Sequence, residues 1–139
     1  MGVDKTRIGF NSTTVDVVGV QGGITATDRA GVSLADGVYN VCRLPAGAII
    51  QKVYLDRVAS FDGTLPTISI GTEGVPAKYL AATATDAATL VVGALELDTK
   101  VSVAEDIVLT LVNGGSTAGE AVAYIEYLDT AARREIFTV

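Results

Sequence analysis

Apolar and polar residues alternate along most of this chain with the two-residue period of half-buried β-strands. The clearest case is residues 67–70, where isoleucine alternates with threonine and serine before Gly71 ends the run. Residues 48–58 form a longer stretch rich in β-branched residues, in which Gln51 and Arg57 are polar interruptions. Two such strands are not stable alone in water, so the rest of the chain is expected to supply a facing sheet.

Turn-forming residues separate these runs. Pro45 fixes its own φ, and Gly47 permits a positive φ, so the strand before them is expected to end there. The Asp62-Gly63 pair is expected to supply a positive φ at Gly63, between the two strands. Residues 113–116, Asn-Gly-Gly-Ser, predict a further turn or hairpin.

The same reasoning predicts strands along the rest of the chain and one short helix. The further strands are predicted at residues 15–20, 38–44, 89–93, 95–103, 106–112 and 119–129. A helix of one or two turns is predicted at residues 77–82, because Pro76 suits a first helical position and good helix formers follow it.

The last predicted strand is largely apolar on both faces. Its two faces consist of Ala121, Ala123, Ile125 and Tyr127, and of Val122, Tyr124, Glu126 and Leu128. A strand of this kind is expected inside a sheet that is covered on one side by its own core and on the other by a partner subunit.

About eight strands with turn signals between them predict an all-β protein, and specifically a jelly-roll-like β-sandwich with one short helix. An immunoglobulin-like sandwich or a small barrel is the alternative, although the chain has no tryptophan and only one cysteine. The predicted organisation is an extended N-terminal arm with one strand (1–35), the sandwich domain (36–129) and an extended C-terminal tail (130–139).

The composition excludes several kinds of chemistry. The 139 residues include no histidine, which removes Ser-His-Asp and Cys-His nucleophilic sites and histidine-ligated metals. Cys42 lacks a disulfide partner and a neighbouring base, so it is interpreted as a small buried hydrophobic residue. We therefore predict that the protein is not an enzyme and that it has no catalytic residues and no cofactor.

Two arrangements of carboxylates, a calcium site and a glycosidase pair, would contradict this prediction. The acids that lie close together in sequence are Glu96, Asp98, Glu105 and Asp106. They could bind Ca²⁺, but they lack the dense spacing of a calcium loop, and solvated turns are the preferred interpretation. A glycosidase pair is disfavoured because nothing provides one carboxylate with an apolar pocket, and we predict no metal site.

Charge and hydropathy argue against several classes of partner. The net charge is −6, and no lysine or arginine cluster exceeds the pair Arg133-Arg134, so a nucleic-acid groove is not expected. No apolar run is long enough for a membrane span, and residues 1–10 lack the apolar core of a signal peptide. Aromatic residues make up only 6% of the chain, which disfavours a sugar-binding platform.

Three segments together resemble a group of small tailed-phage proteins. These are residues 36–58, with the corner Leu-Pro-Ala-Gly-Ala, residues 61–83, with Thr-Ile-Ser-Ile-Gly and Pro-Ala-Lys-Tyr-Leu, and residues 113–127, which close on a Tyr-Ile-Glu-Tyr strand. Proteins of this group are similar to capsid decoration, or cement, proteins. The resemblance spans roughly residues 36–127 and does not include the N-terminal arm.

The resemblance implies a structural virion protein, made in the host cytoplasm, that binds the exterior of the head as a homotrimer. Its partners would be the major capsid protein and its own copies, without nucleic acid, membrane or small-molecule substrate. The residues expected to contact the capsid or neighbouring subunits are Ile8, Phe10, Arg133, Arg134, Ile136, Phe137 and Val139. The alternative is that the apolar residues of this set cap the chain's own core and that the two arginines lie on a solvated surface. The alternative function is a receptor- or glycan-binding tip module of a phage tail or head fibre.

Overall fold

The structure, a computed structural model, describes residues 16–93 and 101–129. Its eight strands are β1 (Asp16–Thr25), β2 (Gly37–Leu44), β3 (Ala48–Ala59), β4 (Thr67–Gly71), β5 (Leu80–Ala84), β6 (Leu90–Gly93), β7 (Glu105–Val112) and β8 (Glu120–Asp129). Within the described ranges no helix occurs, so the predicted all-β class is confirmed. The strand predicted at residues 95–103 lies mostly outside the described residues, and residues 101–103 are not in a strand.

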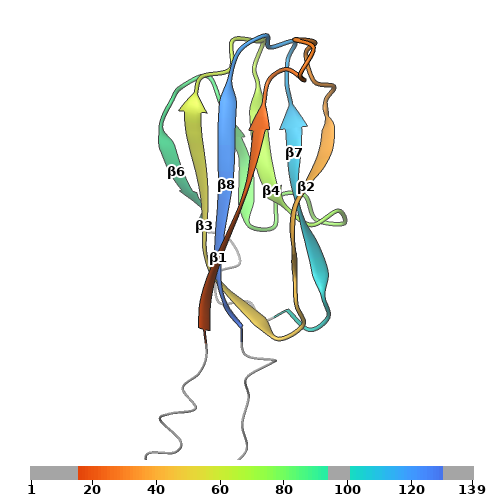
Figure 1. Cartoon of the computed structure of the whole chain (residues 1–139), viewed down its shortest axis with the longest axis vertical. Helices are drawn as coiled ribbons and strands as arrows, with labels where there is room; N and C mark the ends of the chain where they lie inside the picture. Colours follow the sequence, from red (N-terminus) through yellow and green to blue (C-terminus); the bar gives the residue numbers. More distant parts are fainter. Residues whose placement is uncertain (1–15, 94–100, 130–139) are drawn as a thin grey trace, which may run out of the picture.

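The strands form two four-stranded antiparallel sheets that face each other (Figure 1), with the orders β1-β8-β3-β6 and β2-β7-β4-β5. The first strand pairs with the eighth, the second with the seventh, the third with the sixth and the fourth with the fifth. These four pairs correspond to one long antiparallel hairpin made of all eight strands. Folding of this hairpin over itself brings β8 beside β3 and β7 beside β4. This is the jelly-roll arrangement, so the predicted fold class is confirmed.

Strands β3 and β4, which were predicted at residues 48–58 and 67–70, lie in opposite sheets. Their connection therefore crosses from one sheet to the other. The positive φ expected at Gly63 is instead found at Leu65, with φ 49°. Gly63 is needed for space, because a Cβ atom there would lie 2.5 Å from Ser116 Oγ and 2.6 Å from the Asn113 carbonyl oxygen. At the other turn Gly47 has φ 90°, as predicted.

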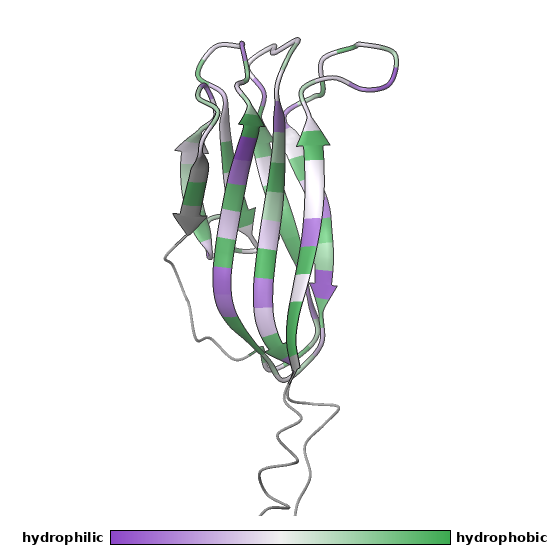
Figure 2. Cartoon of the chain, turned by 60° about the vertical axis from the view of Figure 1, so that its left-hand side comes forward, coloured by the Kyte–Doolittle hydropathy of each residue, from purple (hydrophilic) through white to green (hydrophobic). Residues whose placement is uncertain are grey.

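The alternation of the sequence places one face of each strand in a core between the sheets. Hydrophobic and hydrophilic residues form alternating bands along the strands in Figure 2. The largest fully buried apolar side chains are Leu44, Ile50, Leu55, Ile68, Ile70, Tyr79, Ile107, Leu111 and Ile125. On β8 the burial alternates as predicted, with Ala121, Ala123, Ile125 and Tyr127 facing inward.

The predicted helix at residues 77–82 is wrong. Residues 72–79 form turns, in which the Lys78 N–H donates to the Val75 carbonyl at 3.1 Å, and residues 80–84 are strand β5. A segment of six residues is too short to form a stable helix from propensity alone, whereas β5 gains cross-strand hydrogen bonds with β4. The buried Tyr79 adds an anchor, since its hydroxyl donates to Glu105 Oε1 at 2.6 Å.

The sandwich has two different ends. At the loop end, the connections at residues 26–36, 60–66, 85–89 and 113–119 contact one another through backbone hydrogen bonds. At the terminal end, the Gly47 N–H donates to the Val101 carbonyl at 2.6 Å, and the Val101 N–H donates to the Ala48 carbonyl at 2.8 Å. Ala48 pairs with Asp129, and Asp129 pairs with Asp16, so strands β1, β3 and β8 share this end.

Candidate interaction surface

The predicted contact residues lie outside the described residues. These are Ile8, Phe10, Arg133, Arg134, Ile136, Phe137 and Val139. The chain nevertheless connects residues 1–15 to Asp16 and residues 130–139 to Asp129, and these two positions are register partners on neighbouring strands. Both segments are therefore attached at the terminal end.

The outer face of strands β1, β8 and β3 is exposed to solvent, and on it apolar side chains lie among the polar Gln21, Lys52, Asp56, Glu120 and Glu126. We call this surface the open face, and its apolar side chains are Val17, Ile49, Tyr54, Val122, Tyr124 and Leu128. Val17 is 63% exposed and Tyr124 is 36% exposed, while the other four are half-buried. The sequence indicated the contribution of β8 to this face, but the pairing with β1 and β3 that completes it was not predicted.

The side chains of the open face form rows across the three strands. Val17 and Ile49 flank Leu128 at the terminal end. Further along, Gln21 and Tyr54 flank Tyr124. Because each row combines residues from distant parts of the chain, local sequence pattern does not predict the rows.

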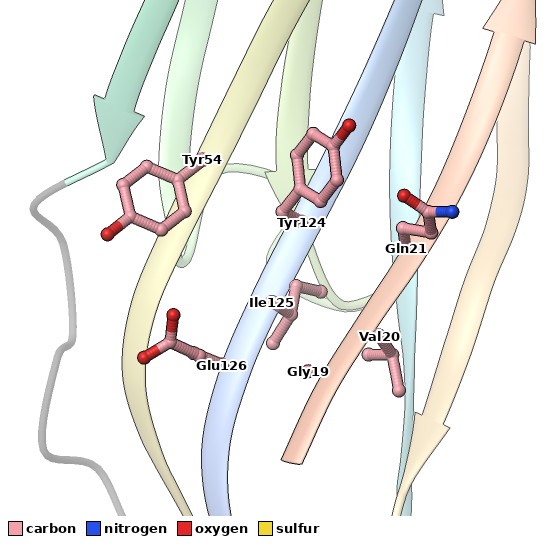
Figure 3. A pocket seen from close by; sticks show the side chains of 7 residues that line it. All are labelled: Gly19, Val20, Gln21, Tyr54, Tyr124, Ile125 and Glu126. Atoms are coloured by element: carbon pink, nitrogen blue, oxygen red, sulfur yellow. The ribbon is translucent and has the colours of Figure 1, made fainter. Parts of the chain in front are cut away.

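A shallow depression lies in the middle of the open face (Figure 3). It has a volume of about 430 Å³, and its lining residues are Gly19, Val20, Gln21, Tyr54, Tyr124, Ile125 and Glu126. Gly19 forms part of its floor, since a Cβ atom built there would meet no other atom within 4 Å. The depression is thus the place where the sheet lacks a side chain on its outer face.

The loop end is organised around a buried asparagine. The Asn113 side-chain amide donates to the Ala26 carbonyl at 3.1 Å and to the Leu34 carbonyl at 3.0 Å. The Asn113 backbone N–H donates to Asp36 Oδ1 at 2.7 Å, and the Ser116 hydroxyl donates to the Asn113 carbonyl at 2.7 Å. Asn113 and Ser116 are fully buried, so these bonds satisfy their N–H and O–H donors where water does not reach, while Asn113 Oδ1 has no hydrogen-bond partner.

Asp62 ties a second pair of loops together at this end. Its carboxylate accepts hydrogen bonds from the Thr117 N–H at 2.7 Å, the Ala118 N–H at 3.1 Å and the Thr117 hydroxyl at 3.0 Å. These donors stabilise the ionised form, and the bond from the Thr117 N–H contributes most to lowering the pKa of Asp62 below its usual value of 3.8. The sequence marked both loops as turns without indicating this contact.

The remaining titratable groups do not assemble a reactive site in the part of the chain that the structure describes. Burial, with a smaller effect of the Asp106 charge, raises the pKa of the half-buried Cys42 thiol to about 11, so it stays protonated at neutral pH. Burial likewise raises the pKa of Tyr127. Across residues 16–93 and 101–129, no three cysteine, aspartate or glutamate side chains gather in a way that could hold a metal ion.

Two of the acids considered for Ca²⁺ are engaged with other side chains. Glu105 accepts the hydrogen bond from Tyr79, and Asp106 forms an exposed salt bridge with Arg43 at 2.9 Å. Glu96 and Asp98 lie outside the described residues. Among the described residues there is no helix with the length and apolar character needed to cross a membrane.

The sequence matches no known family model and no curated protein. Its fold, however, is similar to chains in three solved structures of phage capsids. A chain in the capsid asymmetric unit of cyanophage Pam1 is 20% identical, with a TM-score of 0.66 over 82% of this chain and 85% of that chain.

The other two similar chains come from an acid-stable capsid of the Helicobacter pylori bacteriophage KHP30 and from the capsid of Ralstonia phage GP4. The first is 19% identical, with a TM-score of 0.67 over 83% of this chain and 89% of that chain. The second is 18% identical, with a TM-score of 0.58 over 82% and 84%. At these identities the likeness shows a shared fold.

Proposed function

We propose that this chain is a structural virion protein that binds the exterior of a phage capsid as a homotrimeric decoration protein and stabilises the head. The observation that carries this proposal is that chains of the same fold occur in three phage capsid structures. The aligned region is nearly the same share of both chains in each pair, so those chains are close to this one in length. They are small subunits, as a decoration protein is.

The character of the described surface supports a role in binding rather than in catalysis. Its open face is a sheet surface on which apolar side chains such as Val17 and Tyr124 are exposed among charged ones, a mixture that occurs in surfaces through which proteins contact one another. The one cysteine is held protonated near pH 7, and Glu105 and Asp106 are engaged by Tyr79 and Arg43. We therefore propose that the protein is not an enzyme.

The proposed capsid contacts are the residues already inferred from the sequence. They are Ile8, Phe10, Arg133, Arg134, Ile136, Phe137 and Val139. Their two segments attach to neighbouring register partners, Asp16 and Asp129, so that both can act on the same area of a capsid. This juxtaposition supports the terminal end as the side that faces the shell.

The stabilising mechanism is mass action. A protein that binds the assembled lattice but not its dissociated subunits stabilises the lattice by an amount set by its concentration and affinity. In a trimer, the second and third contacts become intramolecular after the first, so weak single contacts add up to tight binding. A trimer also matches the three-fold symmetry available on an icosahedral shell.

The test uses heads prepared without the protein from the phage that encodes it. Purified full-length protein is added, bound copies per head are counted by quantitative mass spectrometry, and head disruption is followed by calorimetry. We expect hundreds of copies per head and a higher disruption temperature. Phe137→Ser is expected to lower binding, and Leu65→Ser, which changes an 82% exposed residue at the loop end, is the matched control.

Three outcomes would contradict parts of this proposal. Absence of binding to heads would overturn the decoration role. A few copies at the tail together with binding to cells or glycans would favour a tip module. Loss of binding in Leu65→Ser but not in Phe137→Ser would show that the loop end, and not the terminal end, faces the capsid.

A further inference from the structure

Asn113 precedes Gly114 in the chain, and the fold requires both residues. The Asn113 side-chain amide donates to the Ala26 and Leu34 carbonyls at 3.1 and 3.0 Å. Gly114 has a φ of 62°, and a Cβ atom at this position would overlap the Thr64 carbonyl, so only glycine fits. Packing therefore places an Asn-Gly pair here, whereas the other two asparagines of the chain precede other residues.

An Asn-Gly pair can convert without any enzyme. The backbone nitrogen of the glycine loses its proton and attacks the asparagine Cγ, and the new C–N bond closes a five-membered succinimide ring. The side-chain nitrogen takes up a proton and leaves as ammonia. Water then opens the ring at either of its carbonyl groups, which leaves aspartate or isoaspartate. Glycine favours ring closure because no side chain shields its nitrogen or restricts its backbone.

The folded loop end blocks this reaction. The Asn113 amide nitrogen, which would have to leave, is held by two carbonyl groups, and the residue is fully buried, so water does not reach it. The Asn113 carbonyl accepts hydrogen bonds from the Ser116 N–H at 3.1 Å and hydroxyl at 2.7 Å. The Gly114 carbonyl accepts one from the Thr64 N–H at 2.9 Å. Because ring closure needs rotation about the bonds between these groups, the loop end must first open.

The product does not fit the same site. A carboxylate at position 113 would put an oxygen where the amide nitrogen now donates to the Ala26 and Leu34 carbonyls. Its second oxygen would lie where Asn113 Oδ1 has no hydrogen-bond partner. The Asp36 carboxylate, which accepts the Asn113 N–H at 2.7 Å, adds a like charge. A buried charge without donors is strongly destabilising, and isoaspartate would also lengthen the backbone within a packed turn.

We propose that Asn113 is a site of spontaneous deamidation that the folded loop end protects, and that its conversion makes unfolding of the chain irreversible. Conversion proceeds only in molecules whose loops at residues 26–36, 60–66 and 113–119 have separated. The rate in folded protein is then the rate in the unfolded chain multiplied by the fraction of open molecules. The opening of this end therefore sets the lifetime of the folded protein, whatever its role on a capsid.

The first experiment follows Asn113 in full-length protein, in neutral buffer and in concentrated guanidinium chloride. Trypsin digestion separates Asn113 from Asn40, because Arg43 lies between them, and mass spectrometry detects the replacement of an amide by an acid. Asn40 precedes Val41 and serves as the internal control. In denaturant, Asn113 is expected to convert roughly tenfold faster than Asn40 or more, because a branched side chain shields the attacking nitrogen of valine.

In neutral buffer, Asn113 is expected to convert about 10³-fold more slowly than in denaturant, or slower still, which is the ratio that ordinary folding equilibria give. Equal rates in buffer and denaturant would overturn the proposal, because the fold would then give no protection. Equal rates for Asn113 and Asn40 in denaturant would also overturn it, because the glycine would then have no effect.

Ser116→Ala tests whether the loop end controls the conversion. It removes the buried hydroxyl that donates to the Asn113 carbonyl and accepts from the Gly63 N–H at 2.8 Å. Conversion in buffer is expected to become about tenfold faster, with the rate in denaturant unchanged. The matched control is Val17→Ser, which changes a 63% exposed residue near the terminal end and should leave both rates unchanged. A Ser116→Ala rate equal to that of wild type in buffer would contradict the proposal.

The second experiment tests the refolding of converted chains. Partly converted protein is transferred from denaturant to buffer, and folded and unfolded chains are separated by size-exclusion chromatography. Chains converted at Asn113 are expected to be enriched about tenfold or more in the unfolded fraction. Equal shares in the two fractions would show that the fold accepts the product and would overturn the proposed irreversibility.

Asn113→Asp provides the aspartate product directly. It is expected to unfold at a lower denaturant concentration than wild type, and an equal midpoint would contradict the proposed misfit. Binding of wild-type protein to heads, measured separately, tests the capsid role and does not bear on this inference.

Discussion

Side chains at the loop end and on the open face have opposite environments. At the loop end, buried polar groups such as the Asn113 amide and the Ser116 hydroxyl are hydrogen-bonded within the chain. On the open face, apolar side chains such as Val17 and Tyr124 remain in contact with solvent. The chain thus satisfies most buried donors itself at one end of the core, although Asn113 Oδ1 and Thr85 Oγ1 have no partner there, and it leaves apolar side chains exposed on the surface beside the core. Folding and association should therefore respond to different substitutions.

The largest expected effect is at Gly114, which is compared with its neighbour Gly115. Both have positive φ, 62° and 76°, so alanine is strained at either position. A Cβ at Gly114 would also overlap the Thr64 carbonyl and lie 2.8 Å from the Thr64 nitrogen, whereas a Cβ at Gly115 meets nothing. We expect Gly115→Ala to lower the free energy of unfolding by about 1 kcal/mol and Gly114→Ala by about 3 kcal/mol or more.

Urea denaturation measures both variants under the same conditions. Equal decreases in the free energy of unfolding of the two variants would show that backbone strain alone causes the destabilisation. The loops at residues 60–66 and 113–119 would then not be closely packed.

A smaller effect is expected from Asp62→Asn, and it depends on pH. Because the folded-state pKa of Asp62 lies below its value in the unfolded chain, the ionised carboxylate stabilises the fold above pH 3.8. That contribution is lost as the pH falls through the folded-state pKa. The melting temperature of wild type should exceed that of Asp62→Asn at pH 7, and the difference should shrink between pH 4 and pH 2.

Comparing the two proteins at each pH removes the effect of the other carboxylates. A difference in melting temperature that stays constant from pH 7 to pH 2 would show that the ionisation of Asp62 does not contribute to stability. The hydrogen bonds from residues 117 and 118 would then hold the loop irrespective of charge.

The smallest effect on stability is expected from Val17→Ser on the open face. Val17 is 63% exposed, so the free energy of unfolding should change by less than about 0.5 kcal/mol. A loss of 2 kcal/mol or more would mean that this residue is covered within its own chain, and the contrast with the loop end would disappear.

Local pattern was sufficient to predict most of the strands. The alternation in residues 119–129 follows the period of a strand with one face in the core, and β8 confirms it, whereas residues 67–70 form the predicted strand β4 but with Ser69 on its other face buried too. The helix predicted at residues 77–82 failed because pairing between β4 and β5 outweighs a weak local preference. Propensity is a poor guide in such a short segment.

The arrangement of the strands required information that local pattern does not contain. Strands β3 and β4 lie in different sheets because the hairpin of eight strands folds over itself as a whole. The hydrogen bonds of Asn113 join residues that are far apart in sequence, whereas the sequence pattern at residues 113–116 predicts only that a turn lies there. The open face was foreseen on β8 and not on its neighbours, while the contact residues inferred in the two terminal segments remain predictions.

The pairing of Asp16 with Asp129 has a practical consequence for engineering. Directly opposed residues in an antiparallel pair have Cα atoms about 5 Å apart, so in a variant without residues 1–15 and 130–139, and thus without the proposed capsid contacts, a few added residues would join position 129 to position 16. New ends could then be opened at the exposed residues Glu73 and Gly74 without cutting any of the eight strands. A circular permutant built this way would relocate both ends and allow a fused cargo to be carried at a different site on the domain.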